Sequence, residues 1–376
     1  MHILFVWAYL EYPGAAFEIL QKFRERGHKV SVLLGRRDSI PSKMSQGIDV
    51  YFAQSWDFIL LLTGIPYPIF RDVGRWIREI KPDVVHINSH LFFCSYQATH
   101  ASRSFGIPAV LTVHGFVASR GAFYSQLQQV YIRLFGKSIF KNSTRIICLN
   151  SSDAANVAKT VGSYARVSVV PNGADTDLFK PATSKPSKTI VWVGRLVPEK
   201  GLTYLLDAMK KVVASHPDAK LLLVGDGNKK QQLENLARRD GLDSKISFLG
   251  SLDRAAVARI LSAGDVFAFP SLREGMPLAL LEAMASGLPV VSSNISGVNG
   301  LVTDGVDGIL VPPKDSEALA NALLMLLSDE SLRKKLGQNA RKSAEEHSLD
   351  KAILKTEAVY AEALAMRRKE WSEMAG

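Results

Sequence analysis

Cysteine is scarce in this sequence, and its scarcity narrows the classes of protein to consider. Only Cys94 and Cys148 occur among 376 residues. Two cysteines cannot build a disulfide framework or a four-cysteine zinc site. We therefore expect a chain that folds in a reducing, cytoplasmic setting. With 47% hydrophobic and 22% charged residues, the chain has the composition of two or three globular domains.

Long apolar runs and targeting signals are also absent. No uninterrupted apolar run reaches the roughly 18 residues that a membrane span needs. Residues 1–7 lack the basic region and the small-residue cleavage site of a secretory signal, so none is expected. The strongest apolar stretch, Trp56–Phe70, is interrupted by Gly64, Pro66 and Pro68.

Several nucleotide and metal signatures are missing too. The sequence has no Walker-type lysine loop, and Gly225-Asp226-Gly227 lacks the third glycine of a dinucleotide fingerprint. The eight histidines are scattered, and the closely spaced pair Asp175 and Asp177 lies in a predicted linker rather than at a strand end. The residues therefore indicate no metal-ligand cluster.

Positive charge is unevenly distributed along the chain. Of the net charge of +10, residues 1–180 contribute +8, with 20 basic and 12 acidic side chains, and the remainder contributes +2. An anionic substrate, an anionic membrane surface, nucleic acid and simple solubilisation are all consistent with this excess. Basic and aromatic residues do not cluster on one element, so we expect no nucleic-acid partner.

Short β-rich runs alternate with longer amphipathic runs along the chain. This alternation predicts βα units and parallel sheets covered on both faces. It breaks at residues 171–188, where three prolines and only two long apolar side chains indicate a linker. We therefore expect an α/β protein of two similar domains that enclose a cleft. The predicted strands are residues 2–7, 29–34, 83–87, 109–113, 145–149, 167–170, 189–193, 219–225, 245–249, 265–269, 289–292 and 308–311.

The strongest functional signal follows the predicted strand 265–269. The loop contains Glu274 and Gly275, and a helix is expected to begin near Pro277, because proline is favoured in a first helical turn. Free N–H groups at such a helix N-terminus favour an anion. Glu282 is a lone carboxylate on this apolar helix, and ribose hydroxyls are suitable donors to it. Alternatively, Glu282 pairs with a basic residue or a backbone N–H, and Glu274 is an ordinary exposed loop acid.

A second signal follows the predicted strand 189–193. Arg195 and Lys200 lie five residues apart in the loop, and a helix is expected after Gly201. Arginine presents a planar fork to phosphate oxygens and lysine a point charge. The loop therefore suits a pyrophosphate leaving group. The alternative is a solvated loop in which Lys200 pairs with Glu199.

Two weaker signals lie in the first half of the chain. His114 follows a predicted strand and precedes a glycine, so it would point into the cleft and is suited to sugar binding or proton transfer. A lone histidine is often structural. Gly14 follows the first strand and permits a tight turn into the helix expected at 15–26; a plain strand–helix turn is the alternative.

Taken together, these residues resemble the GT4-type retaining glycosyltransferases with the GT-B fold. The similarity covers most of the chain and is densest between Val169 and Pro313. Each piece is weak alone, but the order and spacing are specific. The pieces are Val170–Asp175 with Phe179, Gly194-Arg195-Leu196 with Glu199-Lys200-Gly201, Leu223–Gly227, Phe248-Leu249-Gly250, Glu274 followed after seven residues by Glu282, and Asp304-Gly305 with Gly308–Pro313.

The resemblance implies the GT-B architecture, in which two Rossmann-like parallel-sheet domains face each other across a cleft. Residues 1–175 would form the acceptor-side domain, and residues 176–348 the domain that binds a nucleotide-sugar. Residues 349–376 would form a C-terminal helix that packs back on the first domain.

The resemblance also implies roles for single residues. Arg195 and Lys200 would hold the donor diphosphate and stabilise the departing charge. Glu282 would bind the ribose hydroxyls. Glu274 would contact the transferred sugar, with action as a covalent nucleophile as a weaker alternative. The remaining donor-binding positions are Gly14, Gly250, Gly275, Met276, Pro277 and Leu278.

His114 would lie on the acceptor side and bind the sugar or the diphosphate. Neither a metal nor another cofactor is expected, because the family is generally metal-independent and two protein cations take over the electrostatic role of a metal. Two segments depart from the family pattern: Gly14 is followed by Ala15 rather than by a second glycine, and Ser296–Gly300 lacks an acidic residue.

The implied function is that of a retaining hexosyltransferase, which moves a sugar from a UDP- or GDP-sugar to a glycan or lipid-linked acceptor in polysaccharide, glycolipid or glycoprotein-glycan synthesis. A nucleotide-sugar 2-epimerase and a non-catalytic carbohydrate- or nucleotide-binding module stay open as alternatives. Trp56–Phe70 with Arg71, Arg75 and Arg78 forms either a patch for the cytoplasmic membrane surface or core packing beside a solvated helix face.

Overall fold

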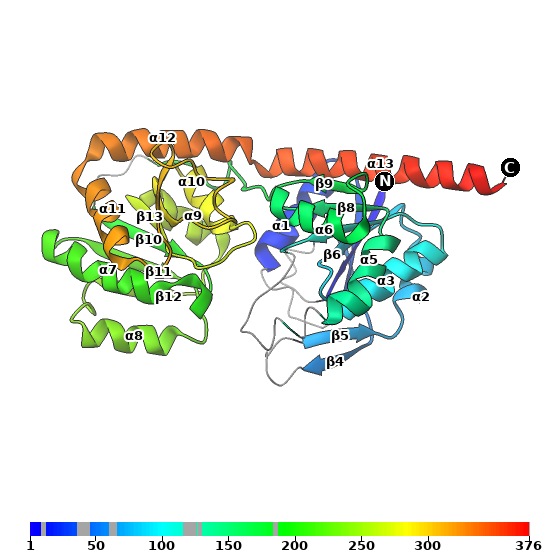
Figure 1. Ribbon diagram of the computed structural model, residues 1–376, viewed down its shortest axis with the longest axis horizontal. Helices are drawn as coiled ribbons and strands as arrows, with labels where there is room; N and C mark the ends of the chain where they lie inside the picture. The colour runs from blue at the N-terminus through cyan, green and yellow to red at the C-terminus, as the bar shows by residue number, and fades with distance from the viewer. Residues whose placement is uncertain are drawn as a thin grey trace. The chain divides into compact units, whose positions relative to one another are not determined.

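A computed structural model describes residues 1–8, 13–35, 46–59, 66–115, 126, 130–182 and 187–375. The chain divides into two compact units (Figure 1). The first contains residues 1–171 together with 352–376, and the second contains residues 172–351. The corresponding boundaries expected from the sequence lie after residues 175 and 348.

The first unit contains a seven-stranded parallel sheet with the strand order β3-β2-β1-β6-β7-β8-β9. The strands are β1 (His2–Trp7), β2 (Lys29–Leu34), β3 (Asp49–Phe52), β6 (Val84–Asn88), β7 (Ala109–Val113), β8 (Arg145–Cys148) and β9 (Val167–Val169). Its helices include α1 (Pro13–Glu25), α2 (Val73–Ile80), α3 (Phe93–Ser104), α5 (Lys137–Asn142) and α6 (Ser151–Val161), with a π-helical turn at Ile132–Gly136. The strand order reverses between β1 and β6.

The strongest apolar stretch of the sequence forms a separate antiparallel pair, β4 (Ser55–Ile59) with β5 (Pro66–Phe70). Phe70 is fully buried in the core of the first unit. The following helix α2 buries Val73 and Ile77, and the guanidinium of Arg75 pairs with Glu79 at 2.7 Å. The middle of the proposed membrane patch, residues 60–65, lies outside the described residues.

The C-terminal helix α13 (Leu349–Ala375) contributes its residues from Ala352 onward to the first unit. Tyr360 on this helix is fully buried, and its hydroxyl lies 2.5 Å from Nδ1 of His86 on β6. Glu357, one turn earlier, pairs with Arg26 at 2.7 Å and with His28 at 2.8 Å. These contacts attach the end of the chain to the first sheet.

The second unit contains a six-stranded parallel sheet with the order β12-β11-β10-β13-β14-β15. Its strands are β10 (Thr189–Val193), β11 (Lys220–Val224), β12 (Ile246–Gly250), β13 (Val266–Phe269), β14 (Val290–Ser293) and β15 (Gly308–Val311). Its helices are α7 (Leu202–Ser215), α8 (Lys230–Arg239), α9 (Arg254–Ala263), α10 (Leu278–Ala285), α11 (Ser316–Ser328) and α12 (Glu330–Glu346), with a 3-10 turn at Pro198–Lys200. The strand order reverses between β10 and β13.

Both faces of this second sheet are covered, as its apolar strands require. Ile190 and Trp192 of β10 pack in one core cluster with residues of α7, α8 and α11. Val191, between them, packs on the other face in a cluster with residues of α9, α10 and α12. The two-domain parallel α/β prediction is thereby confirmed.

The predicted strands agree with the structure to within one or two residues at each end, and five of them match at both ends. Strand β3 and the antiparallel β4–β5 pair are additional to the predicted strands. Residues 171–179 of the predicted linker form neither helix nor strand, yet Ala174 and Phe179 are fully buried in the second unit. This segment is therefore packed rather than loosely tethered.

Candidate functional site

The reversal of strand order between β10 and β13 gives the second unit its natural ligand site. In open parallel sheets, ligands bind beyond the carboxyl ends of the strands at such a switch point. The loops after β10 and β13 meet there. The N–H of Leu272 donates to the carbonyl oxygen of Glu199 at 2.8 Å, and a side chain at Gly201 would overlap the carbonyl oxygen of Pro270.

Two of the predicted catalytic residues pair across these loops. Nζ of Lys200 lies 2.6 Å from Oε1 of Glu274, and the two side chains are 17% and 12% exposed. Nζ of Lys200 also lies 5.7 Å from the centre of the Phe269 ring. Glu274 is therefore not an ordinary exposed loop acid, and the partner of Lys200 is not the neighbouring Glu199.

The loop that carries Arg195 rests on the glycines after β11. The N–H of Leu196 donates to the carbonyl oxygen of Asp226 at 2.8 Å. Gly225 has φ of +130°, and a Cβ atom there would overlap the carbonyl oxygen of Gly194. Gly225-Asp226-Gly227 is thus no dinucleotide fingerprint but a close backbone support for the half-buried Arg195. The sequence signal that points to this backbone support is the glycine directly after the strand.

Gly250 lies at the end of β12, beside this support. Its carbonyl oxygen accepts a hydrogen bond from the N–H of Gly225 at 2.8 Å, and its φ is +69°. Gly250 is therefore linked to the Arg195 loop through Gly225, which it contacts by this hydrogen bond.

Helix α10 begins where the sequence predicted, with Pro277 as the residue before it and Leu278 as its first residue. Proline has no side-chain group that caps the free N–H groups of the first turn, and such groups favour an anion. The preceding Met276 is held by Asn172, whose backbone N–H lies 3.0 Å from its sulfur and whose Nδ2 lies 3.2 Å from its carbonyl oxygen. Gly275 lies between Met276 and the paired Glu274.

Glu282 lies four residues into α10 and is only 5% exposed. Its Oε1 accepts a hydrogen bond from Nη1 of Arg254 at 2.6 Å. Burial raises the pKa of Glu282, and the charge and hydrogen bond of Arg254 oppose that rise. This ion pair between Glu282 and a basic residue is the alternative that the sequence left open. It is compatible with ribose binding, because the ion pair occupies one of the two carboxylate oxygens.

The other two predicted residues belong to the first unit. His114 follows β7, is exposed, and its Nε2 forms a hydrogen bond with Oδ1 of Asn88 at the end of β6. Asn88 was not singled out from the sequence, although the parallel register aligns it with Thr112, two residues before His114.

The expected position of Gly14 in a strand–helix loop is wrong. Helix α1 begins at Pro13, so Gly14 lies in its first turn. Proline is favoured at this position because its φ is already helical. The residues between β1 and this helix, 9–12, are not among the described ones.

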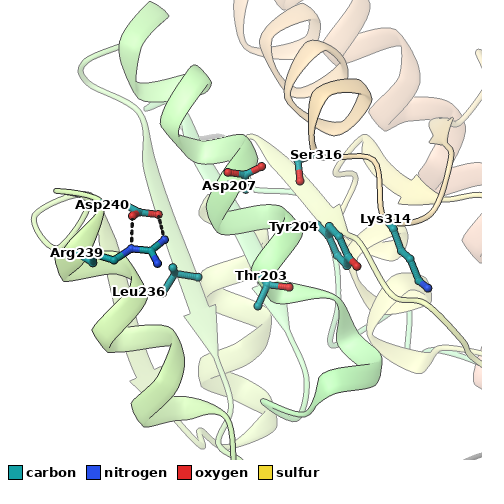
Figure 2. A pocket seen from close by; sticks show the side chains of 8 residues that line it. All are labelled: Thr203, Tyr204, Asp207, Leu236, Arg239, Asp240, Lys314 and Ser316. Atoms are coloured by element: carbon teal, nitrogen blue, oxygen red, sulfur yellow. Dashed lines mark hydrogen bonds and ion pairs between the residues drawn. The ribbon is translucent and has the colours of Figure 1, made fainter.

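A shallow pocket of about 340 Å³ lies elsewhere on the second unit, between α7, α8 and the turn before α11 (Figure 2). Its acidic residues are already paired: Asp240 with Arg239 at 2.8 Å, and Asp207 with Lys210. None of the predicted site residues lines it. We therefore place the candidate site at the β10–β13 switch point.

The described residues include no cluster of three histidine, cysteine or carboxylate side chains that could hold a metal ion. Cys94 and Cys148 are buried and unpaired with each other. Among the described helices, none combines the length and the apolar character of a membrane span.

Comparison with known proteins agrees with the class that this fold and site define. Residues 15–178 match the model of Glycosyltransferase Family 4, and residues 174–343 match that of Glycosyl transferases group 1. The chain belongs to this family of glycosyltransferases, as the sequence motifs had indicated.

Two curated relatives and one solved structure illustrate the family. The chain is 35% identical over 277 residues to the Escherichia coli UDP-Gal:alpha-D-GlcNAc-diphosphoundecaprenol alpha-1,3-galactosyltransferase, covering 69% of this chain and 70% of the relative. It is 28% identical over 356 residues to the phosphatidyl-myo-inositol mannosyltransferase of Mycolicibacterium smegmatis, covering 90% and 86%. HepE of Anabaena in complex with UDP and glucose superposes with a TM-score of 0.78 at 21% identity, covering 96% of this chain and 100% of HepE.

Proposed function

We propose that this glycosyltransferase moves a sugar from a UDP-sugar to a hydroxyl of a lipid-linked acceptor, with retention of configuration and without a metal ion. The observation that carries the proposal is the arrangement at the β10–β13 switch point. There the largely buried pair of Lys200 and Glu274, the Arg195 loop and the uncapped start of α10 adjoin the ends of two neighbouring strands.

The cations of the second unit perform the central electrostatic step. Arg195 and Lys200 bind the donor diphosphate, and the free N–H groups at the start of α10 add a partial positive charge. When the bond between the anomeric carbon and the phosphate oxygen breaks, negative charge grows on that oxygen. Fixed cations stabilise this charge in the transition state, which is the role a metal has in other transferases.

The sugar and the ribose are held by the two carboxylates. Glu274 binds hydroxyls of the transferred sugar while it restrains Lys200, and Glu282 accepts hydrogen bonds from the ribose. The acceptor oxygen attacks the anomeric carbon from the face that the phosphate leaves, and a donor phosphate oxygen takes the hydroxyl proton. His114, held by Asn88, has a proposed role in binding the sugar or the diphosphate.

The donor and acceptor classes are suggested by the relatives. The Escherichia coli relative is named for UDP-Gal and a diphosphoundecaprenol-linked sugar, and the Mycolicibacterium smegmatis relative for phosphatidyl-myo-inositol. An acceptor presented by a membrane agrees with the positive charge of residues 1–180.

The test is a panel of UDP- and GDP-sugars incubated with the protein, with and without an extract of membrane lipids, and analysed by mass spectrometry. We expect a glycosylated lipid and free UDP only when both a UDP-sugar and lipid are present. An isomerised sugar formed without acceptor would instead identify an epimerase. Binding of UDP without any turnover across a broad acceptor set would identify a non-catalytic module.

A further inference from the structure

Arg254 occupies an unfavourable position for a cation. It is the first residue of α9, directly after the N-cap Asp253, whose side chain accepts the N–H of Ala256 at 2.7 Å. The start of a helix carries partial positive charge, so a cation there weakens the helix slightly. The reason for the charge must therefore lie in what the side chain contacts.

The guanidinium of Arg254 lies between an aromatic ring and a carboxylate. Nη1 is 2.6 Å from Oε1 of Glu282, and Cζ is 5.0 Å from the centre of the Phe179 ring. Phe179 is fully buried and Arg254 is 21% exposed. A flat guanidinium stacked on a ring keeps its orientation, which a flexible lysine would not.

The backbone of Phe179, whose ring supports Arg254, is tied to the end of helix α10. Nη1 of Arg341 donates to the carbonyl oxygens of Thr176, Phe179 and Ala285 at 3.0, 2.8 and 2.7 Å. Ala285 is the last residue of α10, the helix that carries Glu282. Phe179, Arg254 and Glu282 are thus parts of one packed group within the second unit.

Glu282 needs a neighbouring cation because its carboxyl is buried. Burial raises the pKa of Glu282, and Arg254 opposes the rise. A buried carboxyl that loses its cation takes up a proton instead of keeping its charge. Among the described residues, no hydrogen bond engages the second oxygen of Glu282, Oε2, so this oxygen is available to a ligand.

We propose that Arg254 is a positioning residue for the donor site, which holds Glu282 ionised and oriented so that its second oxygen accepts a ribose hydroxyl. This inference takes the ribose-binding role of Glu282 from the proposed function. It adds Arg254 as the residue that keeps Glu282 charged and in place for that role. Arg254 acts through Glu282 and not by contact with the donor.

The test measures the Kd of UDP and of 2′-deoxy-UDP by calorimetry between pH 7 and pH 9. We expect the wild type to prefer UDP at all these pH values. Arg254→Gln should weaken UDP binding about tenfold at pH 7, because a charged hydrogen bond contributes on that order, and should lose the preference over 2′-deoxy-UDP. Its affinity for UDP should recover as the pH is raised and the carboxyl of Glu282 ionises. KM for the donor should rise while kcat changes little, since a ribose contact exists before and in the transition state.

Three further variants separate this role from a merely structural one. Arg254→Lys should retain part of the affinity and of the ribose preference. In a Glu282→Gln background, Arg254→Gln should add no further loss of affinity. Arg259→Gln, on an exposed residue of the same helix, should bind UDP like the wild type.

Additive losses in the double variant, or an unchanged preference for UDP over 2′-deoxy-UDP in Arg254→Gln, would overturn the proposal. If Arg254→Gln does not fold, Arg254→Lys takes its place in the same double-variant comparison with the same criterion. A wild-type protein that does not bind UDP would contradict the proposed function itself. If the wild type binds UDP and the Arg254 variant keeps the same preference for UDP over 2′-deoxy-UDP, only the role of Arg254 is contradicted.

Discussion

At the scale of single residues, the ion pair between Lys200 and Glu274 influences the net charge of the candidate site. Both side chains are largely buried, and their charges cancel at 2.6 Å. The pair as a whole is therefore neutral, but its positive end is fixed at Lys200, where the proposed function places the donor diphosphate. A largely buried cation that already has a carboxylate partner is held in place before the donor arrives.

Replacement of Lys200 or Arg195 by Ala should lower kcat by a factor of about 100 to 1,000, because each removes a cation from the departing phosphate. Unfolding free energy should change by no more than about 2 kcal/mol for Arg195→Ala, since this side chain does not belong to the apolar core. Lys200→Ala should cost more, up to about 3–5 kcal/mol, because it leaves the largely buried Glu274 without its cation. Steady-state kinetics and urea unfolding measure the two effects. Lys210→Ala, which removes an exposed cation of the same unit, is the control, and unchanged turnover in both site variants would refute their assignment.

His86 is a second residue with a measurable consequence. It is buried between Tyr360 and Thr112, with ring nitrogens 2.5 and 2.9 Å from their hydroxyls. Burial, with a smaller effect of His114, lowers the pKa of His86 to about 3. Between that value and the ordinary pKa of about 6.5, the unfolded chain binds a proton that the folded chain does not.

Unfolding free energy should therefore fall as the pH decreases from about 6.5 toward 3, with His86 contributing up to about 1.4 kcal/mol per pH unit. His86→Gln should remove this contribution and give a shallower pH dependence. Urea unfolding of both proteins at several pH values from about 4.5 to 7 measures it. Parallel curves for the two proteins would show that His86 becomes protonated in the folded state as easily as in the unfolded one.

At the scale of elements, close contact between loops positions the site. The loop after β10 lies against Gly225, where φ is +130° and a Cβ atom would overlap the carbonyl oxygen of Gly194. The loop after β13 lies against Gly297, where a Cβ atom would overlap the carbonyl oxygen of Glu274. The glycines thus fix the two loops that carry the cation and its carboxylate partner.

Gly225→Ala should displace the Arg195 loop, lower turnover at least tenfold and cost more than about 2 kcal/mol of unfolding free energy. Gly241 provides a matched control, because it also has positive φ, +68°, but a Cβ atom there would meet nothing within 4 Å. Gly241→Ala should cost only the conformational strain of about 1 kcal/mol and leave turnover unchanged. Equal effects of the two substitutions would exclude the close loop contact as the cause.

Elements with a regular hydrophobic period were predictable from sequence, and those set by tertiary packing were not. The strands β1, β2, β7, β10 and β15 match their predicted bounds because they are short, mostly apolar runs, and β2, β7 and β10 are followed directly by Gly35, His114 and Gly194. The β4–β5 pair was read instead as a broken apolar stretch, because Pro66 and Pro68 disguise an isolated hairpin. The sequence pattern predicts Gly14 in a loop, whereas Pro13, whose φ is already helical, starts α1 two residues before the expected helix.

At the scale of the whole molecule, the two units have separate cores and separate sheets. The residues proposed to hold the nucleotide, Arg195, Lys200 and Glu282, all belong to the second unit. The positive charge excess belongs mainly to residues 1–180. Within the proposed function, this charge excess suits an anionic acceptor or membrane surface, whereas the proposed donor contacts are a few local groups.

UDP at about 100 times its Kd should stabilise the folded chain by about 2.7 kcal/mol, and the protection should be concentrated in the second unit. Hydrogen exchange read by mass spectrometry should slow at residues 194–201 and 270–285. The central strands β1 and β6 of the first sheet serve as the internal reference and should exchange as before. Protection confined to the first unit would contradict the placement of the donor.

The sequence alone determined the α/β class, the two parallel sheets, most strand ends and the loops that hold the candidate residues, because hydrophobic periodicity, glycine and proline act over a few neighbouring positions. Only the tertiary structure decided which of these residues meet. Lys200 pairs with Glu274 across 74 positions and Arg254 with Glu282 across 28. The first pair depends on β10 and β13 being neighbours in the sheet although two strands separate them in the chain. The second depends on the packing of α9 against α10, and residue spacing carries no record of either arrangement.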